Sequence, residues 1–540
     1  MMVRILTLPL LAPVAAAALS SGNAGDKVTD QKRIGIIGAG AAGSSAAYHL
    51  AQYARDADIP TQIDVYERSA HVGGRSTTIN PWDHPHYSVE LGASIFVEVN
   101  HILVNASRDF GLRTATRMVH DDKGMADLGI WNGKEFVYTM TDEGGWWDMA
   151  KLFWRYGYAP VKTNSLMKDT VGKFLNFYEK PLFPFKSLSK AVQDVGLIEV
   201  TGLTGEQFLK NKGVGDLFAN EIIQASTRVN YASNLGSIHG VETMVCMAAN
   251  GAMQIDGGNW QIFDRMLSSS SSIATHLNAT ITHISKQTNG TYVLTFSNGG
   301  TKTFDQIILA SPLQFSHLVI DPAPAHVPDQ IPYIKLHVTH FATPHKLSPS
   351  AFNLPPDAQV PQAILTTIPA EEPYPHNDTT YNGSPGFFSI SILKSLINPL
   401  SAVPRQEYVY KIFSDEPVSA AFLSNYLGVP VTDAEIEGTA DPDANVSWFH
   451  HKLFHSYPHE FPRVTFEELK LDDGLWYTSG MESFISTMET NALMGRNIAR
   501  LVVDRWLEEK LEGAEDVFEG WRYEGLQQPA GQQQPFHAKL

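Results

Sequence analysis

The chain has 540 residues, 43% of them hydrophobic, so it can bury a large core, and we expect two or three domains. Its 40 lysine and arginine residues face 57 aspartate and glutamate residues, which gives a formal net charge of −17. This balance argues against nucleic acid as a partner, because nucleic-acid binding needs a basic surface. It also argues against electrostatic docking to anionic membranes.

The N-terminus has the pattern of a secretory signal. Arg4 precedes an apolar run from Ile5 to Leu19, and small residues near Ala18–Ala24 offer a cleavage site. We therefore predict a signal peptide at residues 1–24. The alternative is an uncleaved anchor, although the run is too short to span a bilayer comfortably. No other segment has a transmembrane pattern.

Glycosylation motifs favour the same secretory route, with the protein secreted or in a vacuole- or lysosome-like compartment. They occur at Asn105, Asn278, Asn289, Asn377, Asn382 and Asn445. The last three residues, Ala538-Lys539-Leu540, are close to a peroxisomal address, so the peroxisome is the minor alternative.

A glycine-rich turn carries the first chemical signal. The apolar run Ile34–Ile37 predicts a buried strand, and Gly38, Gly40 and Gly43 follow it in G-x-G-x-x-G spacing before a helix. The first glycine allows a tight turn, the second lets backbone approach a pyrophosphate, and the third lets helix and strand pack closely. The helix N-terminus attracts phosphate as well. We predict a Rossmann-like dinucleotide site.

The next strand and turn extend this motif. Ile63–Tyr66 predicts a strand that ends at Glu67, whose carboxylate can accept hydrogen bonds from both ribose hydroxyls of an adenosine. Arg68 follows, and then Gly73-Gly74-Arg75, where the glycines permit close backbone approach and Arg75 can neutralise pyrophosphate charge. Because this extension is typical of flavin enzymes and rare in nicotinamide enzymes, we predict FAD.

Later segments have the character of backbone that faces a flavin. The first of them would run beside the flavin ring, the third would meet the adenine, and the last would open a helix from about Glu482 to Glu509 that stabilises the anionic reduced flavin. These segments are Gly92-Ala93-Ser94, Gly257-Gly258, the strand that starts at Ile281, and Gly480-Met481-Glu482.

Flavin-type segments at the start, middle and end of the chain predict an α/β fold. We expect a Rossmann-like FAD-binding domain of the glutathione-reductase and amine-oxidase type, interleaved with an α+β substrate domain. FAD-binding parts are predicted at 31–110, 236–325 and 465–512, substrate-domain parts at 111–235 and 326–464, and a disordered tail at 513–540. Tyr292–Phe296 and Thr303–Leu309 are expected to form a hairpin.

Cysteine and histidine give little sign of a nucleophile or a metal. Cys246 is the only cysteine, so no intrachain disulfide is possible, and its apolar surroundings indicate a small buried side chain. No H-E-x-x-H spacing is present, so we predict no metal and interpret the histidine-rich stretch as a solvated loop. That stretch contains His450, His451, His455 and His459.

Two other groups of residues leave alternatives open. His239 and Glu242 are candidates for proton transfer, with a surface pair as the alternative. An aromatic cluster would either wall a channel for an isoprenoid chain or pack the apolar face of a helix. Its members are Trp146, Trp147, Phe153, Trp154, Tyr156 and Tyr158.

Ordered motifs along residues 33–510 resemble those of the prenylcysteine oxidases, also called farnesylcysteine lyases. The resemblance implies FAD, a prenylated cysteine substrate and molecular oxygen. Hydride would leave the prenyl carbon bonded to sulfur, water would add, and cysteine, a prenyl aldehyde and hydrogen peroxide would form. The motifs are Trp154-Arg155-Tyr156-Gly157, Arg228-Val229-Asn230-Tyr231, Asp256-Gly257-Gly258-Asn259, Tyr408-Val409-Tyr410-Lys411-Ile412-Phe413-Ser414 and Gly480-Met481-Glu482.

One of these motifs holds the catalytic candidates. Arg228 would pair with the carboxylate of cysteine or form a structural ion pair, and Asn230 and Tyr231 would position water or substrate. Two other functions stay open. The first is an amine, polyamine or polyene oxidase on the same fold, and the second is a secreted isoprenoid-binding flavoprotein without turnover.

Overall fold

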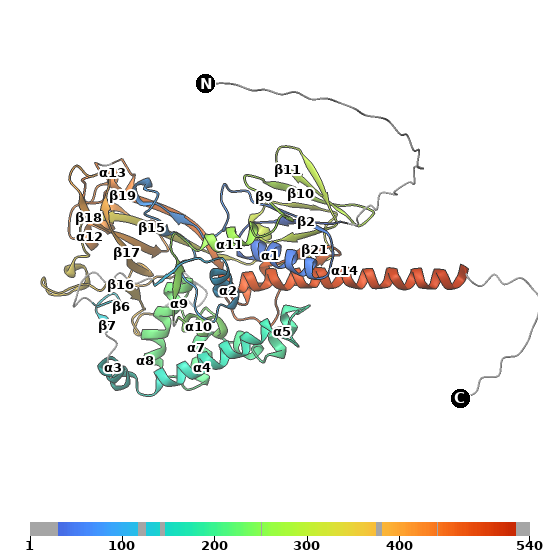
Figure 1. Cartoon of the computed structure of the whole chain (residues 1–540). Coiled ribbons are helices and arrows are strands. Elements are labelled where there is room, and N and C mark those ends of the chain that lie inside the picture. Colours follow the sequence, from blue (N-terminus) through green and yellow to red (C-terminus); the bar gives the residue numbers. More distant parts are fainter. Residues whose placement is uncertain are drawn as a thin grey trace, which may run out of the picture.

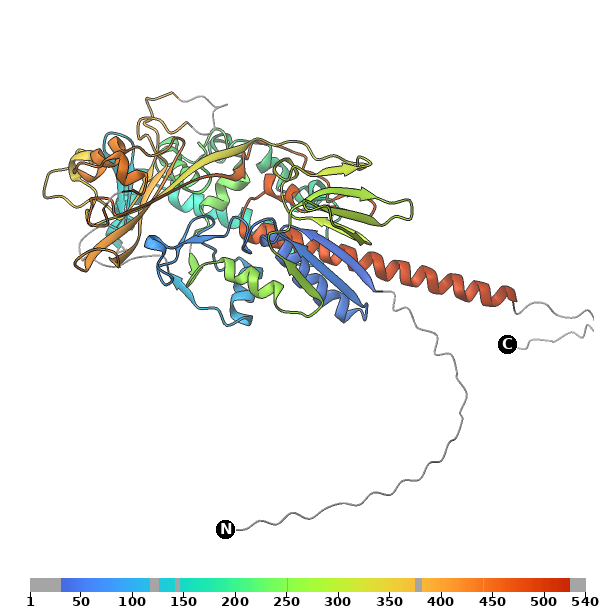
Figure 2. The same cartoon turned by 90° about the horizontal axis from the view of Figure 1, so that it is seen from above.

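The computed structural model describes residues 31–116, 126–140, 146–249, 251–373, 381–439 and 441–524. The predicted signal peptide lies outside the described residues. Two sheet-centred bodies lie side by side, and a layer of helices covers one side of them (Figure 1). The last helix, α14 (Met488–Glu524), extends away from both bodies, on the side opposite the sheet that contains β15, β17 and β18 (Figure 2).

The first body is built on a six-stranded sheet of order β20-β21-β13-β1-β2-β9. Its pairings are parallel except at β20. Central side chains such as Ile36 and Val65 are fully buried, because helices cover one face of the sheet and a smaller sheet packs on the other. The bounds are β1 Lys32–Ile37, β2 Thr61–Tyr66, β9 Ile273–His276, β13 Gln306–Leu309, β20 Lys470–Asp472 and β21 Leu475–Tyr477. Three distant stretches of chain thus form one sheet.

Helices α1 (Ala41–Asp56) and α14 cross at very short range beside this sheet. A Cβ atom at Gly495 would lie 2.1 Å from the carbonyl oxygen of Ala42, so only glycine fits there. The Ser45 hydroxyl donates to the Ala492 carbonyl at 2.6 Å. The first and last helices are therefore fixed to each other.

A smaller sheet of order β12-β11-β10-β14 packs on one face of the first. Its bounds are β10 Ile281–Lys286, β11 Tyr292–Phe296, β12 Thr301–Phe304 and β14 Val319–Asp321. The expected hairpin partner 303–309 is in fact two strands. Only β12 pairs with β11, whereas β13 pairs with β1 in the large parallel sheet. The run Gln306–Leu309 is apolar enough to be buried on both faces, and this draws it into the parallel sheet.

The second body contains a seven-stranded sheet of order β19-β15-β18-β17-β16-β6-β7, hereafter the substrate sheet. Its bounds are β6 Leu128–Trp131, β7 Phe136–Met140, β15 Tyr333–Thr343, β16 Ala363–Thr366, β17 Ser389–Asn398, β18 Arg405–Ser414 and β19 Trp448–Pro458. The expected histidine-rich loop is wrong, because His450, His451 and His455 belong to β19 and pair across to β15.

The helical layer lies between these sheets and solvent (Figure 1). Its main helices are α3 Trp146–Tyr156, α4 Ala159–Leu175, α5 Leu188–Asp194, α7 Gly205–Asn211, α9 Gln224–Tyr231 and α10 Gly240–Cys246. On α3 the side chain of Trp154 is 94% exposed and that of Phe153 is 49% exposed, so neither walls an internal channel. Tyr156 instead packs inside the helical layer.

The remaining elements are short. The helices are α2 His101–Asp109, α6 Ile198–Thr201, α8 Asp216–Phe218, α11 Trp260–Leu267, α12 Ala420–Leu427, α13 Asp433–Ile436 and the 3₁₀ turn η6 Ser479–Ser483. The strands are β3 Thr78–Ile79, β4 Val89–Glu90, β5 Thr114–Thr116 and β8 Met253–Ile255.

The predicted fold class is confirmed, but the chain end differs from the prediction. The last helix starts at Met488 rather than at Glu482 and continues to Glu524, so residues 513–524 are helical rather than disordered. Residues 525–540 lie outside the described part of the chain. Within that part, no helix is both long and apolar enough to cross a membrane.

The glycine turn gives a direct test of the fold. A Cβ at Gly43 would lie 1.9 Å from the Gly38 carbonyl oxygen, so Gly43→Ala should force α1 away from β1 and cost about 1–3 kcal/mol in the free energy of unfolding. Gly172 is the control, because it lies inside α4 with no atom within 4 Å of an added Cβ. Gly172→Ala should stabilise by about 0.5–1 kcal/mol. Urea unfolding measures both, and equal effects would contradict this packing.

Candidate active site

A cavity of about 860 Å³ runs from the six-stranded sheet of the first body, hereafter the nucleotide sheet, to the substrate sheet. One end is lined by Ile281 at the start of β10, the middle by Gly40 and Gly74, and the far end by Leu336 of β15 and Phe413 of β18. The cavity therefore connects a glycine-built turn with apolar side chains of the other body.

Two glycine turns meet at the middle of this cavity. Gly38 has a φ of +111°, and the Gly73 amide donates to the Ala39 carbonyl at 2.9 Å, which joins the two turns. An added Cβ at Gly40 would have no neighbour nearer than 3.8 Å, so the backbone there is open to the cavity. The N-terminus of α1 begins at this point, and the cradle fits the pyrophosphate of a dinucleotide.

Glu67 is held at the end of β2 by the backbone. The Ala39 amide donates to its Oε2 at 3.0 Å and the Ser69 amide to its Oε1 at 2.9 Å. The side chain is nearly buried and lines the cavity, as does Arg68, whose guanidinium donates to the Phe315 carbonyl at 3.0 Å. A fixed carboxylate at this place fits the ribose role predicted for Glu67.

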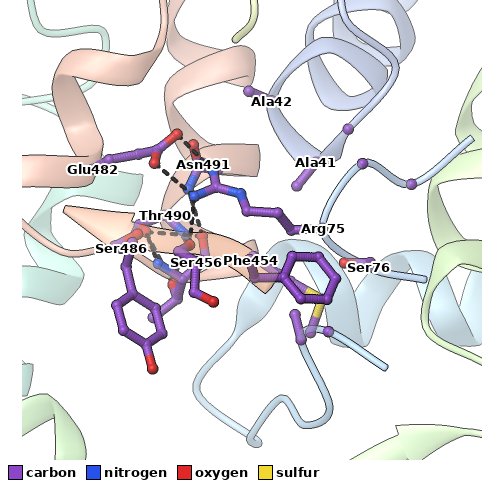
Figure 3. Close-up of a pocket in the computed structure, with 18 of the residues that line it drawn as sticks. Ala41, Ala42, Arg75, Ser76, Phe454, Ser456, Glu482, Ser486, Thr490 and Asn491 are labelled. Carbon is purple, nitrogen blue, oxygen red and sulfur yellow. Dashed lines mark hydrogen bonds and ion pairs between the residues drawn. The ribbon is translucent and has the colours of Figure 1, made fainter. Parts of the chain in front are cut away.

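Arg75 forms a bidentate ion pair with Glu482 that the sequence did not predict. Its Nη1 and Nη2 atoms donate to the two Glu482 carboxylate oxygens at 2.8 and 2.7 Å, and Nη1 also donates to the Ser456 carbonyl at 2.7 Å (Figure 3). The Tyr333 hydroxyl donates to Glu482 at 2.9 Å. Burial opposes the charge of Arg75, but Glu482 raises the pKa of Arg75 above its ordinary value. Its positive charge is therefore already matched.

The segment Gly92-Ala93-Ser94 lines the cavity. The Lys411 ammonium of β18 holds this segment, donating to the Glu90 and Gly92 carbonyls at 3.1 and 3.4 Å and to the Ser94 hydroxyl at 3.0 Å. Lys411 also lines the cavity and was missed as a site residue. Its signal in the sequence was a single lysine among the apolar residues of a strand.

Several predicted cofactor residues lie outside the cavity lining. Gly257 and Gly258 form the turn between β8 and α11, where an added Cβ on Gly258 would strike Thr78. Gly480 packs against Glu467, and Met481 is fully buried in the core. Gly43 supports the turn from behind. Because α14 begins late, the cavity is lined instead by Ser486, Thr487, Thr490 and Asn491.

Only two of the three catalytic candidates lie at the cavity. Asn230 and Tyr231 line the cavity, but Arg228 does not. Arg228 is fully buried and donates to Thr366 Oγ1 at 3.0 Å and to the Asn382 carbonyl at 2.7 Å. These bonds hold α9 against the substrate sheet, so the structure does not support pairing of Arg228 with a substrate carboxylate.

Among the described residues, no group of three or more histidine, cysteine, aspartate or glutamate side chains could hold a metal ion. The cavity lining thus combines two glycine turns, the Glu67 carboxylate and apolar side chains.

The chain belongs to the prenylcysteine lyase family, because the model of that family matches residues 139–516. A second model, described as an NAD(P)-binding Rossmann-like domain, matches residues 36–125. Both agree with the resemblance and the nucleotide fold predicted from the sequence.

Individual proteins support the same grouping. The chain is 28% identical to a farnesylcysteine lyase of Arabidopsis thaliana, covering 92% of this chain and 93% of the relative. It is 27% identical to prenylcysteine oxidase 1 of Homo sapiens, covering 88% and 89%. A solved putrescine oxidase triple mutant superposes with a TM-score of 0.53 at 13% identity, covering 88% of this chain and 99% of that chain. At this identity the likeness concerns the fold alone.

The Arg75–Glu482 pair can be tested without a ligand. Glu482→Gln would leave a charged guanidinium, 34% exposed, without its 2% exposed carboxylate, and should cost about 1–3 kcal/mol in the free energy of unfolding. Glu509→Gln is the control, because its more exposed pairs with Lys32 and Arg505 should each contribute less than about 1 kcal/mol. Urea unfolding of both variants measures the difference. Equal losses would show that the Arg75–Glu482 pair adds no more stability than the exposed pairs do.

Proposed function

We propose that this protein is an FAD-dependent oxidase that cleaves prenylcysteine to cysteine, a prenyl aldehyde and hydrogen peroxide. The observation that carries the proposal is the continuity of the glycine cradle with an apolar chamber in one cavity. Family membership supports it, since the relatives carry the names farnesylcysteine lyase and prenylcysteine oxidase.

The described residues fit FAD along the length of the cavity. The start of β10 at Ile281 would receive the adenine, Glu67 the ribose hydroxyls, and Gly40 and Gly74 the pyrophosphate. The segment Gly92-Ala93-Ser94 would lie along the flavin ring. When bound, FAD would accept a hydride and pass two electrons to oxygen, a chemistry that the side chains themselves cannot supply.

The chamber beyond Gly92-Ala93-Ser94, hereafter the ring segment, fits an isoprenoid chain. It is lined by Leu336 and Val338 of β15, Phe413 of β18, and Val171 and Phe174 of α4. Burying a prenyl group here removes apolar surface from water and excludes solvent from the reacting carbon. This carbon is activated because both the sulfur lone pair and the allylic double bond stabilise positive charge.

Asn230 and Tyr231 would supply polar contacts on the otherwise apolar wall. The Asn230 amide is oriented by donation to the Ser226 carbonyl at 3.0 Å, and the Tyr231 hydroxyl by donation to the Ser486 carbonyl at 3.1 Å. Groups fixed in this way can hold the water molecule that adds to the carbon. The carbon–sulfur bond of the adduct then breaks.

Secretion remains part of the proposal. The apolar leader at residues 1–24 and the glycosylation motifs support a route through the secretory pathway, with the lysosome-like or vacuolar compartment or the exterior as destination.

Anaerobic mixing tests the function. Farnesylcysteine should bleach the yellow flavoprotein and release one cysteine per flavin, and air should then return the colour with one peroxide. An S-alkylcysteine with a saturated chain of equal length is the control, and should bind but bleach at least about 100-fold more slowly, because it lacks allylic stabilisation worth a few kcal/mol. Bleaching by putrescine alone would favour an amine oxidase. Binding of farnesylcysteine without bleaching would favour a carrier.

A further inference from the structure

A cluster of buried ionisable side chains lies behind the wall of the cavity. His239 caps the N-terminus of α10, Glu242 is in the first turn of that helix, and Glu460 follows β19. The exposed fractions of these three side chains are 0%, 0% and 1%. The Nε atom of Arg463 is buried beside them. None of these four residues lines the cavity itself.

The hydrogen bonds of His239 fix its ring. The Glu242 amide donates to His239 Nδ1 at 3.1 Å, so the neutral ring carries its proton on Nε2, which lies 3.6 Å from Glu460 Oε2. Burial, and after it the charge of Arg463, lowers the pKa of His239 to about 3. His239 therefore stays neutral and cannot balance the charge of a carboxylate.

Neither carboxyl group has the partners that an ionised group needs. Within the described residues, none of the four carboxyl oxygens of Glu242 and Glu460 has a hydrogen-bond partner within bonding distance. An ionised carboxylate in such a place is strongly disfavoured. Burial raises the pKa of Glu242 to about 8. Burial and the charge of Glu242 raise the pKa of Glu460 well above its ordinary value, although Arg463 opposes this. The pair therefore holds protons at neutral pH.

Tyr231 links the pair to the cavity. It lines the cavity, and its ring packs on Tyr457 with 4.9 Å between ring centroids. Burial first, and then the charge of Glu242, raises the pKa of Tyr231 well above its ordinary value, so its hydroxyl keeps its proton. Cys246 also lines the cavity, and burial and Glu242 raise the pKa of its thiol. The side chain of Tyr231 thus lies between the cavity and the pair formed by Glu242 and Glu460.

We propose that Glu242 and Glu460 form a buried proton store that supplies the departing cysteine sulfur through the Tyr231 hydroxyl. This inference rests on the proposed function. Tyr231 would be the catalytic residue, and the two glutamates act through it. The surrounding ionisable groups are His239, Cys246, Arg463, Glu482 and Tyr457.

The proton transfers balance within one step. The carbon–sulfur bond of the water adduct breaks with its electron pair passing to sulfur, and sulfur takes the proton of the Tyr231 hydroxyl. Tyr231 takes a proton from Glu242. The hydroxyl group on the same carbon becomes the aldehyde carbonyl, and its released proton restores Glu242. No oxidant is consumed in this step, since the carbon was oxidised before.

The substitution Glu242→Gln separates this step from oxidation. Glutamine matches the size of a protonated glutamate and replaces a group without partners, so the variant should fold. In anaerobic rapid mixing with farnesylcysteine, flavin bleaching should keep its rate within about 2-fold, whereas cysteine release should slow by about 10²-fold or more. Tyr231→Phe should also slow cysteine release by about 10²-fold or more. Equal rates of release in wild type and both variants would overturn the proposal.

The pH profile gives the sign of the effect. Because Glu242 must carry a proton to act as an acid, cysteine release by the wild type should be constant below about pH 8 and fall as the pH rises through that value. Glu242→Gln should release cysteine slowly and without this fall. A wild-type profile that falls instead as the pH drops through about 8 would contradict an acid role.

Glu407→Gln is the matched control. Glu407 is also fully buried, but it accepts bonds from Arg405, Asn398 and Ser447 and does not line the cavity. This variant should lose stability while keeping the wild-type ratio of cysteine release to flavin bleaching. If it changes the ratio as Glu242→Gln does, loss of stability explains the effect and the relay is wrong.

Infrared spectroscopy tests the store without turnover. The resting wild type at pH 7 should show a carboxylic acid carbonyl band that shifts in heavy water, and this band should weaken in Glu242→Gln and in Glu460→Gln but persist in Glu407→Gln. Absence of the band in the wild type overturns the inference. If the band is present but farnesylcysteine does not bleach the flavin, the proposed function fails while the proton store stands, and its task as a donor to sulfur is refuted.

Discussion

The contact between two glycine turns is the constraint on which the rest of this structure depends. Gly40 and Gly73 pair through their backbones, and an added Cβ at Gly43 or Gly73 would lie about 2 Å from a carbonyl oxygen. Close contact here leaves Gly40 itself open to the cavity. A bulkier side chain in either turn would fill the space where backbone amides can meet a phosphate. Because glycine has no side chain, the backbone of these turns forms the polar half of the site.

Interleaving of the chain follows from this geometry. The nucleotide sheet needs strands from three distant stretches, and Gly495 lets the last helix lie directly against the first. Arg75 and Glu482 then join the second glycine turn to the segment before α14 across the cavity floor. A cavity closed by both chain ends is complete only when the whole chain has folded, and the substrate sheet is inserted between those ends.

Local patterns identified the glycine turns and the carboxylate that line the cavity. Glycine spacing and the acid at the end of β2 specify a turn and a carboxylate whose positions depend on neighbours within about 30 residues, as the bond from Ala39 to Glu67 shows. Tertiary context decided the rest. Gly257-Gly258 had the right pattern, but packing of Gly258 on Thr78 keeps the turn away from the cavity. The helix predicted from Glu482 starts at Met488, since a 3₁₀ turn precedes it.

Charged side chains were the hardest part to place from the sequence. Arg228 stands in a family motif and has the charge a substrate carboxylate would need, yet its guanidinium donates to Thr366 of the substrate sheet and to oxygens of Asn234 and Asn382. Lys411 stands in another motif as one lysine among apolar residues, and it contacts the ring segment from a different body. Which cation faces a cavity depends on strand register and helix rotation, which no short motif encodes.

The distribution of charge along the cavity explains why the buried acids are unusual. At the glycine turns, the carboxylates of Glu67 and Glu482 accept hydrogen bonds from backbone amides, Arg75 and Tyr333. Glu242 and Glu460 lie a short way behind the apolar end and lack such donors. A fold needs no carboxyl group there, because leucine or methionine would pack better without a desolvation penalty. Glu242 and Glu460 destabilise the fold at their positions, and their role is therefore to be sought in the reaction.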